Sequence, residues 1–228
     1  FMEDMHIHLK EAIYNQELFD KYVRRCIECG LTKVVFLDHG NRISSKHTPV
    51  LFTQNSINSF NERIYEFRKS NMAEKIKVIK GIEIDYSHDL NFRKETFDIL
   101  NYGNFEWIVG AIHSMKFENY KQYLEAIIDM LNNYRINVIA HIKKSDDYYK
   151  YTNMFVEILN ICHEKNILIE INTSDRSRWE ENQLYYMLEL MEKYGVDYVY
   201  SSDAHRYEDV GYMIKETEAM VRRWKKKR

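Results

Sequence analysis

Short apolar runs rich in β-branched residues alternate with stretches of helical periodicity along the chain, and each pattern occurs seven times. Strands that are joined through helices run parallel, with right-handed crossovers. Seven such units in 228 residues predict an α/β fold whose sheet closes into a TIM-like barrel rather than staying open. Strands are predicted at 5–8, 33–38, 77–84, 107–113, 136–141, 167–172 and 196–202. Helices are predicted at 16–29, 54–71, 92–101, 118–133, 151–165, 180–194 and 208–226.

The length and composition favour a single domain. A chain of 228 residues suits one domain with a sizeable core, and no repeat, low-complexity segment or Pro/Gly-rich linker interrupts it. We therefore expect one domain over residues 2–228. Gly30 and Gly195 each follow a predicted helix and precede a predicted strand, as glycines at the C-terminal ends of helices do.

The charge balance argues against a nucleic-acid partner. The 33 basic and 35 acidic residues give a net charge of −2, whereas a nucleic-acid-binding surface needs clustered positive charge. The basic residues at 222–228 end the last predicted helix, where they complement the helix dipole, and we interpret them as a solvated tail. No apolar stretch reaches the roughly 18 residues that span a bilayer, and no signal-peptide pattern opens the chain. We expect no membrane partner.

The cysteines indicate a reducing, cytoplasmic setting, because there are three of them and no framework of disulfide-like spacings. Cys26 and Cys29 form a C-x-x-C motif inside an amphipathic helical segment, without a second pair. Two interpretations stay open: a buried pair of thiols one turn apart, or a redox or zinc motif.

Residues that bind metals gather at or just beyond the C-terminal ends of the predicted strands. In a barrel of parallel strands these ends meet at one face, where active sites lie. A hydrogen-bonded core histidine or a rim carboxylate would explain any one of them, but not their shared placement. Imidazoles and carboxylates that converge from separate strands suit a multinuclear metal site. The candidate ligands are His6, His8, His39, Glu83, His113, His141, Asp203 and His205.

Local spacing adds detail to two of these strand ends. His6 and His8 alternate on the first predicted strand, so their rings point to one side and can bind one metal together. Asp4 is expected on that side too, where it would orient an imidazole. Glu83 ends a strand after Gly81, whose missing side chain allows the backbone to approach closely. A carboxylate can bridge two cations, which a neutral imidazole cannot do.

Three histidines fall outside the strand-end pattern. His163 lies in a predicted helix and is assigned a structural or solvent-facing position. His88 lies a few residues past Glu83, close enough for a role behind the site or at the substrate. His47 belongs to the long irregular stretch at residues 40–53, which contains the only proline and is expected to form a rim or a lid.

The ordered set of motifs resembles the PHP (polymerase and histidinol phosphatase) superfamily. The matching residues are Asp4-x-His6-x-His8, Asp38-His39, Gly81-x-Glu83, His113, His141 and Ser202-Asp203-Ala204-His205. The resemblance covers nearly the whole chain and implies a distorted (β/α)7 barrel with a two- or three-metal site at the C-terminal ends of the strands. It also implies how the ligands are shared: one metal on His6, His8, Glu83 and Asp203, a second on Glu83, His113 and His141, and a third on His39 and His205.

Within the superfamily, residues 81–86 (GIEIDY) and 170–174 (EINTS) resemble the histidinol-phosphatase branch. Three departures from that branch stand out. Tyr14 occupies the position where the branch supplies a further His or Asp to the third metal, and Glu11 is the alternative ligand. Ile142-Lys143-Lys144 follows His141 in place of Pro-Asp. Asp175-Arg176-Ser177-Arg178 follows Ser174 in place of glycine and basic residues.

The ligand set and the resemblance together predict a metal-dependent phosphoric ester hydrolase. We expect two or three divalent metal ions, Zn, Mn or Fe rather than Mg or Ca, because imidazoles dominate the site. A metal-activated hydroxide would attack a small phosphomonoester, with histidinol phosphate, and hence histidine biosynthesis, as one candidate. Catalytic roles fall to Glu83, Asp203 and His205, and Asp203 is also a candidate proton donor to the leaving group.

Arginines are the expected substrate-binding residues, because a guanidinium binds phosphate through two parallel hydrogen bonds. Arg176 and Arg178, just past a strand end, are the first choice, and Arg42 in the long irregular stretch is the second. Two alternatives remain open: a phosphodiesterase or phosphotyrosine phosphatase of the same superfamily, and a non-catalytic metal-binding module.

Overall fold

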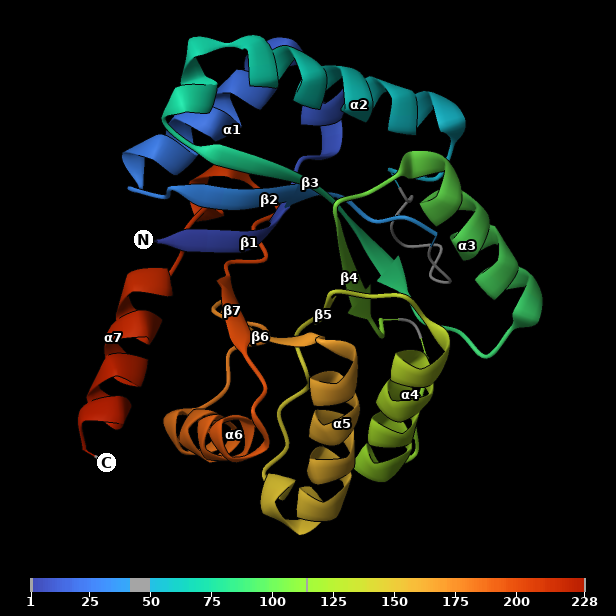
Figure 1. Cartoon of the computed structure of the whole chain (residues 1–228), viewed down its shortest axis with the longest axis vertical. Helices are drawn as coiled ribbons and strands as arrows, with labels where there is room; N and C mark the ends of the chain where they lie inside the picture. The colour runs from blue at the N-terminus through green and yellow to red at the C-terminus, as the bar shows by residue number, and fades with distance from the viewer. Residues whose placement is uncertain (1, 42–49, 114, 228) are drawn as a thin grey trace.

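Seven parallel strands form one sheet in chain order, from β1 to β7. The computed structural model describes residues 2–41, 50–113 and 115–227. The strands gather at the centre of the molecule and the helices lie outside them (Figure 1). The strands are β1 (Glu3–His8), β2 (Lys33–Leu37), β3 (Lys77–Asp85), β4 (Trp107–Ala111), β5 (Val138–Ile139), β6 (Leu168–Asn172) and β7 (Tyr198–Ser201). All seven predicted strands are confirmed.

The two ends of the sheet meet, and this contact nearly closes it into a barrel. Ile7 of β1 pairs in parallel with Ala204, just after β7, and the His8 amide donates a hydrogen bond to the Ala204 carbonyl at 2.8 Å. The buried Asp4 carboxylate adds a second link, because it accepts a hydrogen bond from the Ser202 amide at 2.9 Å. The predicted TIM-like α/β barrel is therefore confirmed.

The seven main helices follow the strands in strict alternation. They are α1 (Gln16–Glu28), α2 (Gln54–Lys69), α3 (Leu90–Gly103), α4 (Tyr120–Asn133), α5 (Thr152–Lys165), α6 (Glu181–Tyr194) and α7 (Ile214–Lys226). Four begin at a side-chain cap, since Asn15, Thr53, Asp89 and Asn119 each accept a hydrogen bond from the amide three residues on. Gly30 and Gly195 have φ angles of +76° and +65° at the ends of α1 and α6, as predicted for helix stops.

Several predicted boundaries differ from the structure, and two of the differences lie beside the polar end of the barrel. The last helix begins at Ile214 rather than at residue 208, because the segment before it turns back toward the barrel, where Asp4 accepts a hydrogen bond from the Gly211 amide at 2.9 Å. Strand β5 ends at Ile139 rather than at residue 141. His141 has a left-handed backbone with a φ of +27°, which is incompatible with a strand.

Two apolar cores flank the sheet. The smaller core fills the inside of the barrel, as in a packed barrel rather than a pore. It consists of Met5, Val35, Leu37, Val109, Ala111, Val138, Ala140 and Val199. The larger core lies between the sheet and the helices, where, for example, Phe19 of α1 packs edge-on against Phe36 of β2 with ring centroids 5.4 Å apart. The polar strand ends therefore rest on a filled interior, which fixes their positions.

The cysteines and the described basic residues at the end of the chain do not lie at the polar end of the barrel. Cys26 is buried and Cys29 is half-buried on α1, where the Cys29 thiol donates to the Val210 carbonyl at 3.4 Å. No candidate metal-binding group among the described residues includes a cysteine.

The described basic residues at the end of α7 are exposed, and Trp224, which lies between them in the sequence, is half-buried. Within the described ranges, none of the helices combines the length and apolar character that a membrane span requires.

We predict that Gly81→Ala destabilises the protein by about 1–3 kcal/mol, because it overpacks the barrel interior. A Cβ atom at Gly81 would lie 2.5 Å from Val35 Cγ1 and 3.1 Å from the Trp107 carbonyl oxygen. Urea unfolding in the presence of a chelator measures the change without a contribution from bound metal. Lys77→Ala, at the exposed start of the same strand, is the control and is expected to change stability by less than about 0.5 kcal/mol. Equal stability of the two variants would contradict the prediction.

Candidate metal centre

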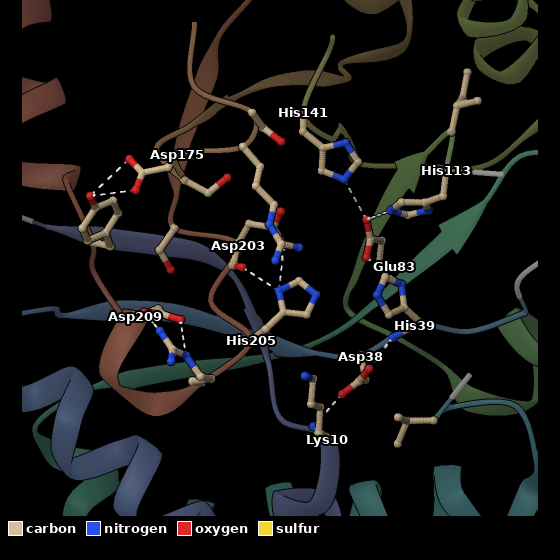
Figure 2. Close-up of a pocket in the computed structure, with 18 of the residues that line it drawn as sticks. Lys10, Asp38, His39, Glu83, His113, His141, Asp175, Asp203, His205 and Asp209 are labelled. Carbon is tan, nitrogen blue, oxygen red and sulfur yellow. Dashed lines mark hydrogen bonds and ion pairs between the residues drawn. The ribbon is translucent and has the colours of Figure 1, made fainter. Parts of the chain in front are cut away.

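A cavity of about 1700 Å³ opens over the C-terminal ends of the strands. Six of the predicted ligands line it: His39, Glu83, His113, His141, Asp203 and His205. Figure 2 shows Glu83 between His113, His141 and His39, with Asp203 and His205 on the opposite side. His6 and His8 lie fully buried beneath them, so the structure brings all eight predicted ligands together.

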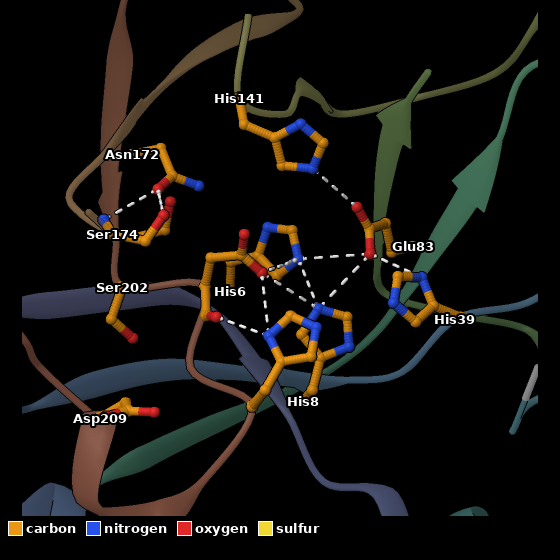
Figure 3. A network of polar contacts seen from close by, with 12 residues as sticks. His6, His8, His39, Glu83, His141, Asn172, Ser174, Ser202 and Asp209 are labelled. Atoms are coloured by element: carbon orange, nitrogen blue, oxygen red, sulfur yellow. Dashed lines mark hydrogen bonds and ion pairs between the residues drawn. The ribbon is translucent and has the colours of Figure 1, made fainter. Parts of the chain in front are cut away.

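The first group of ligands surrounds a point between β1 and the end of β7. His6 Nε2 and His8 Nε2 are 3.0 Å apart, and Asp203 Oδ1 lies 3.6 Å and 3.3 Å from these two atoms. Glu83 Oε2 lies 3.6 Å and 3.4 Å from them (Figure 3). A tetrahedral site with bonds of about 2.0–2.2 Å separates its ligand atoms by roughly 3.3–3.6 Å. The spacing of this group therefore suits a zinc-sized ion.

The second group uses the other oxygen of the same carboxylate. Glu83 Oε1 lies 3.0 Å from His113 Nε2 and 3.1 Å from His141 Nε2. Only 1% of the Glu83 side chain is exposed, so water cannot compensate its charge. The two oxygens of one buried carboxylate thus face two sets of imidazoles, which is the arrangement that a bridging ligand requires.

The charge states of these groups show what a cation would replace. Burial alone would raise the pKa of the Glu83 carboxyl, but His113, His39 and His6 hold that pKa well below its usual range. Burial opposes protonation of His113, yet the Glu83 carboxylate raises the pKa of this imidazole to about 9. Without metal, a proton on an imidazole supplies the positive charge that Glu83 needs. A bound cation would displace that proton and take over its role.

Histidines also form a third group. The rings of His8 and His205 stack with centroids 4.0 Å apart, and those of His39 and His205 lie 6.0 Å apart. Burial lowers the pKa of His39 and of His205 to about 4, so both imidazoles are neutral at pH 7, the form that binds metals. Tyr14, at the position where the resemblance expects another ligand, is 57% exposed. Glu11 lines the cavity, but no candidate metal group among the described residues includes it.

Hydrogen bonds behind the imidazoles fix their tautomers. His6 Nδ1 lies 2.7 Å from Glu170 Oε1, so a neutral His6 keeps its proton on Nδ1 and presents the lone pair of Nε2 to the first group. His205 Nδ1 lies 2.8 Å from the Asp203 carbonyl oxygen. Because a carbonyl only accepts hydrogen bonds, Nδ1 must carry the proton and Nε2 is left as the ligand atom. Both rings are thus held in the form that a metal requires.

Glu170 on β6 is the functional residue whose role the sequence analysis missed. Its buried carboxylate accepts hydrogen bonds from His6 Nδ1, from the His141 amide at 2.5 Å and from Ser201 Oγ at 2.5 Å. It therefore positions ligands of both the first and the second group. The signal was present in the sequence, because a carboxylate between Ile169 and Ile171 on an interior strand must have partners.

The role predicted for Asp4 is wrong. The pairing of β1 with β2 shifts register between Asp4 and Ile7, so the simple alternation of side chains along β1 does not hold. Asp4 accepts hydrogen bonds from the Ser202 amide and hydroxyl, at 2.9 Å and 2.5 Å, and none from an imidazole ring. It fastens the segment that carries Asp203 to the start of β1, while Glu170 orients His6 instead.

Three residues of the cavity wall have strained backbones. Lys10, His141 and Asp203 adopt left-handed φ angles of +49°, +27° and +53°. Non-glycine residues in this region cost of the order of 1–3 kcal/mol each, and such strain concentrates at functional sites. The left-handed backbone turns the chain at two candidate ligands, His141 and Asp203, so that they leave the direction of their strands and line the cavity.

The predicted substrate arginines divide between two places. Arg176 lines the large cavity. Arg178 lies at a separate small pocket near Trp179, where its guanidinium is 3.7 Å from the Asp175 carboxylate. The structure therefore does not bring Arg178 to the candidate metal groups. Arg42, with the rim or lid expected around it, lies outside the described residues.

Two of the histidines outside the pattern, His163 and His88, lie away from the candidate metal groups. His163 Nδ1 on α5 lies 3.0 Å from the Gly195 carbonyl, which fits the structural position expected for it. His88 Nδ1 lies 2.9 Å from the Tyr86 hydroxyl and is not among the residues that line the cavity. His47 lies outside the described residues.

The fold and the site together define a class: an α/β-barrel protein with a candidate multinuclear metal centre at the C-terminal ends of its strands. Comparison with known families makes the assignment specific. The chain belongs to the PHP domain family, whose sequence profile matches residues 4–174.

Individual relatives point in the same direction. The chain is 24% identical over 197 residues to a histidinol-phosphatase of Lactococcus lactis subsp. lactis (strain IL1403), a match that covers 75% of this chain and 71% of that protein. In three dimensions it is similar to a crystal structure of histidinol phosphate phosphatase from the same organism, complexed with zinc, L-histidinol and phosphate. That match has a TM-score of 0.77 and 20% identity, and it covers 98% of this chain and 93% of the other.

A second crystal structure, of the putative histidinol phosphatase from Listeria monocytogenes, matches with a TM-score of 0.67 and 17% identity. It covers 94% of this chain and 99% of that one. At these identities the two structures establish the shared fold.

We predict that Glu83→Gln lowers the metal content of the purified, reconstituted protein from about two ions per chain to at most one. The amide keeps the size of the side chain but loses the charge that both groups of imidazoles share. Elemental analysis measures the change. Glu125→Gln, on the exposed face of α4, is the matched control and should leave the metal content unaltered. Retention of both ions by Glu83→Gln would rule out the bridging role.

We also predict that Glu170→Gln weakens metal binding by about 10- to 100-fold, the usual effect of removing a carboxylate behind a histidine ligand. The expected loss affects both groups, because Glu170 contacts His6 and the backbone of His141. Competition with a fluorescent zinc chelator measures the affinity. Glu164→Gln, exposed on α5, serves as the control. Wild-type affinity in Glu170→Gln would show that the hydrogen bond to His6 does not tune the site.

Proposed function

We propose that the protein is a metal-dependent phosphatase that hydrolyses a small phosphomonoester. One observation carries the proposal: the buried Glu83 carboxylate presents one oxygen to His6 and His8 and the other to His113 and His141. Membership of the PHP domain family and the likeness to histidinol-phosphatases support the same reaction.

In this proposal His6, His8, Asp203 and Glu83 hold one cation, while Glu83, His113 and His141 hold the second. The ligand set, with imidazoles in the majority, suits Zn, Mn or Fe. Cations held by these residues would lower the pKa of bound water and neutralise charge that develops on the phosphoryl oxygens. The protein contributes rigid placement, because Glu170 and Asp4 hold the ligand-bearing segments from behind.

Asp203 is better suited to bind a cation than to donate a proton. Burial would raise the pKa of its carboxyl, but the neighbouring His6 and His8 lower that pKa below the usual range. Asp203 is therefore a carboxylate at neutral pH in the metal-free protein. His205 Nδ1 is also occupied, since it donates to the Asp203 carbonyl. The proton for the leaving group is accordingly assigned to water in the cavity rather than to Asp203.

Recognition of the phosphate is assigned to Arg176, because it is the predicted arginine on the wall of the large cavity. Histidinol phosphate is the first substrate to test, since the similar sequence and the similar crystal structure from Lactococcus lactis both carry the name of a histidinol phosphatase, and that crystal structure contains L-histidinol and phosphate. The rim of this chain carries Lys143, Lys144 and Asp175, which are departures from the branch pattern and set its specificity.

The reaction is tested with metal-replete protein on a panel of phosphomonoesters that includes histidinol phosphate and p-nitrophenyl phosphate. We expect hydrolysis that a chelator abolishes and that added Zn²⁺ or Mn²⁺ restores, because the cations supply the nucleophile. A phosphodiester in the same panel separates the two kinds of ester hydrolase. Metal-loaded protein that hydrolyses no phosphate ester would contradict the proposal and favour a metal-binding module.

The role of Arg176 is tested by a pair of conservative substitutions. Arg176→Lys keeps the charge but loses the two parallel hydrogen bonds, so kcat/KM is expected to fall roughly 10- to 100-fold. Arg178→Lys, in the separate small pocket, is the matched control and should stay within about twofold of wild type. If kcat/KM falls in Arg178→Lys and stays near the wild-type value in Arg176→Lys, the residue that binds the phosphate is Arg178 rather than Arg176.

A further inference from the structure

Lys10 lies on the wall of the cavity that also holds histidines of the third group. It lines the cavity together with His39 and His205. Figure 2 shows it beside Asp38, on the side of the cavity where His205 lies. Among the described residues its ammonium has no ion-pair partner. A positive charge is thus placed on the wall of a site that binds anions in the proposed reaction.

The backbone of Lys10 is held in place by the same carboxylate that contacts the third group. Asp38 Oδ2 accepts a hydrogen bond from the Lys10 amide at 2.5 Å. Asp38 Oδ1 accepts one from the His39 amide at 2.8 Å and lies 3.5 Å from His8 Nδ1. Because Asp38 is buried, these contacts tie Lys10 rigidly to His8 and His39.

The conformation of Lys10 indicates that its side chain has a use. Its φ of +49° lies in the left-handed region, which glycine adopts without strain and lysine does not. A lysine at this position is therefore present despite a local cost. Such strain persists where the surrounding structure enforces it, most often at binding and catalytic sites.

The third group is a poor site for a divalent cation. His8 Nε2 already lies among His6, Glu83 and Asp203 in the first group, and one neutral imidazole nitrogen binds one metal. This leaves His39 and His205, with Tyr14 exposed where a further ligand is expected. The carboxylate next to His39, Glu83 at 2.9 Å, already faces the first two groups, so His39 and His205 have no carboxylate of their own and make an incomplete shell.

We propose that the Lys10 ammonium takes the place of a third metal ion and binds a phosphoryl oxygen of the substrate directly. The inference rests on the proposed phosphatase function and adds a substrate-binding residue to it. The enzyme would then work with two metal ions and one fixed organic cation. An ammonium is a compact point charge with three donors, which suits a phosphate oxygen.

The test measures binding of inorganic phosphate to zinc-loaded protein by calorimetry, with metal content determined on the same samples. Lys10→Gly removes the ammonium and suits the left-handed backbone, so this variant is expected to fold and to keep about two zinc ions. Its affinity for phosphate should fall about 10- to 100-fold, whereas Lys10→Arg should keep most of it. Lys121→Ala removes an exposed lysine of α4, one that lies 3.6 Å from Glu125 and is not part of the cavity wall, and should change the affinity less than twofold.

Two results would overturn the inference about Lys10. The first is phosphate affinity of Lys10→Gly within twofold of wild type. The second is a third zinc ion bound to His39 and His205 in the wild-type protein. Failure of the proposed function looks different, because metal-loaded wild-type protein would then hydrolyse no phosphate ester, whatever its affinity for inorganic phosphate.

Discussion

The burial of Glu83 is the constraint on which the rest of the site depends. A carboxylate that is 1% exposed loses its hydration, and a protein tolerates such a charge only when other groups compensate it. The compensation comes from imidazoles on β1 and at the ends of β2, β4 and β5, all within 3.6 Å of its two oxygens. Barrel closure, the strained turns and the hydrogen bonds behind the histidines all serve to bring these rings to one carboxylate.

Closure of the barrel and assembly of the site depend on the same contacts. Asp4 joins the first strand to Ser202, and the next residue, Asp203, completes the first group of ligands. Glu170 joins β6 to His6 on β1 and to His141 after β5. A change in either carboxylate should thus affect stability and metal affinity together, which distinguishes these residues from the ligands that they hold.

Much of this arrangement follows from the sequence. The seven strand–helix units predict parallel strands, and parallel strands bring their C-terminal ends to one face, so the convergence of the eight ligands could be predicted without coordinates. The errors arise where local backbone geometry overrides the regular pattern. The register shift in β1 turns Asp4 away from the histidines, and the left-handed His141 shortens β5. The small pocket that holds Arg178 apart from Arg176 depends on packing against α6 and α7, which no local pattern encodes.

The central claim is a pair of cations on either side of Glu83, and anomalous diffraction from zinc-loaded crystals tests it most directly. The account predicts two zinc peaks, one near His6, His8 and Asp203 and one near His113 and His141, separated by about 3.5–4 Å with the carboxylate between them. A single peak, or two peaks with Glu83 bound to neither, would contradict it.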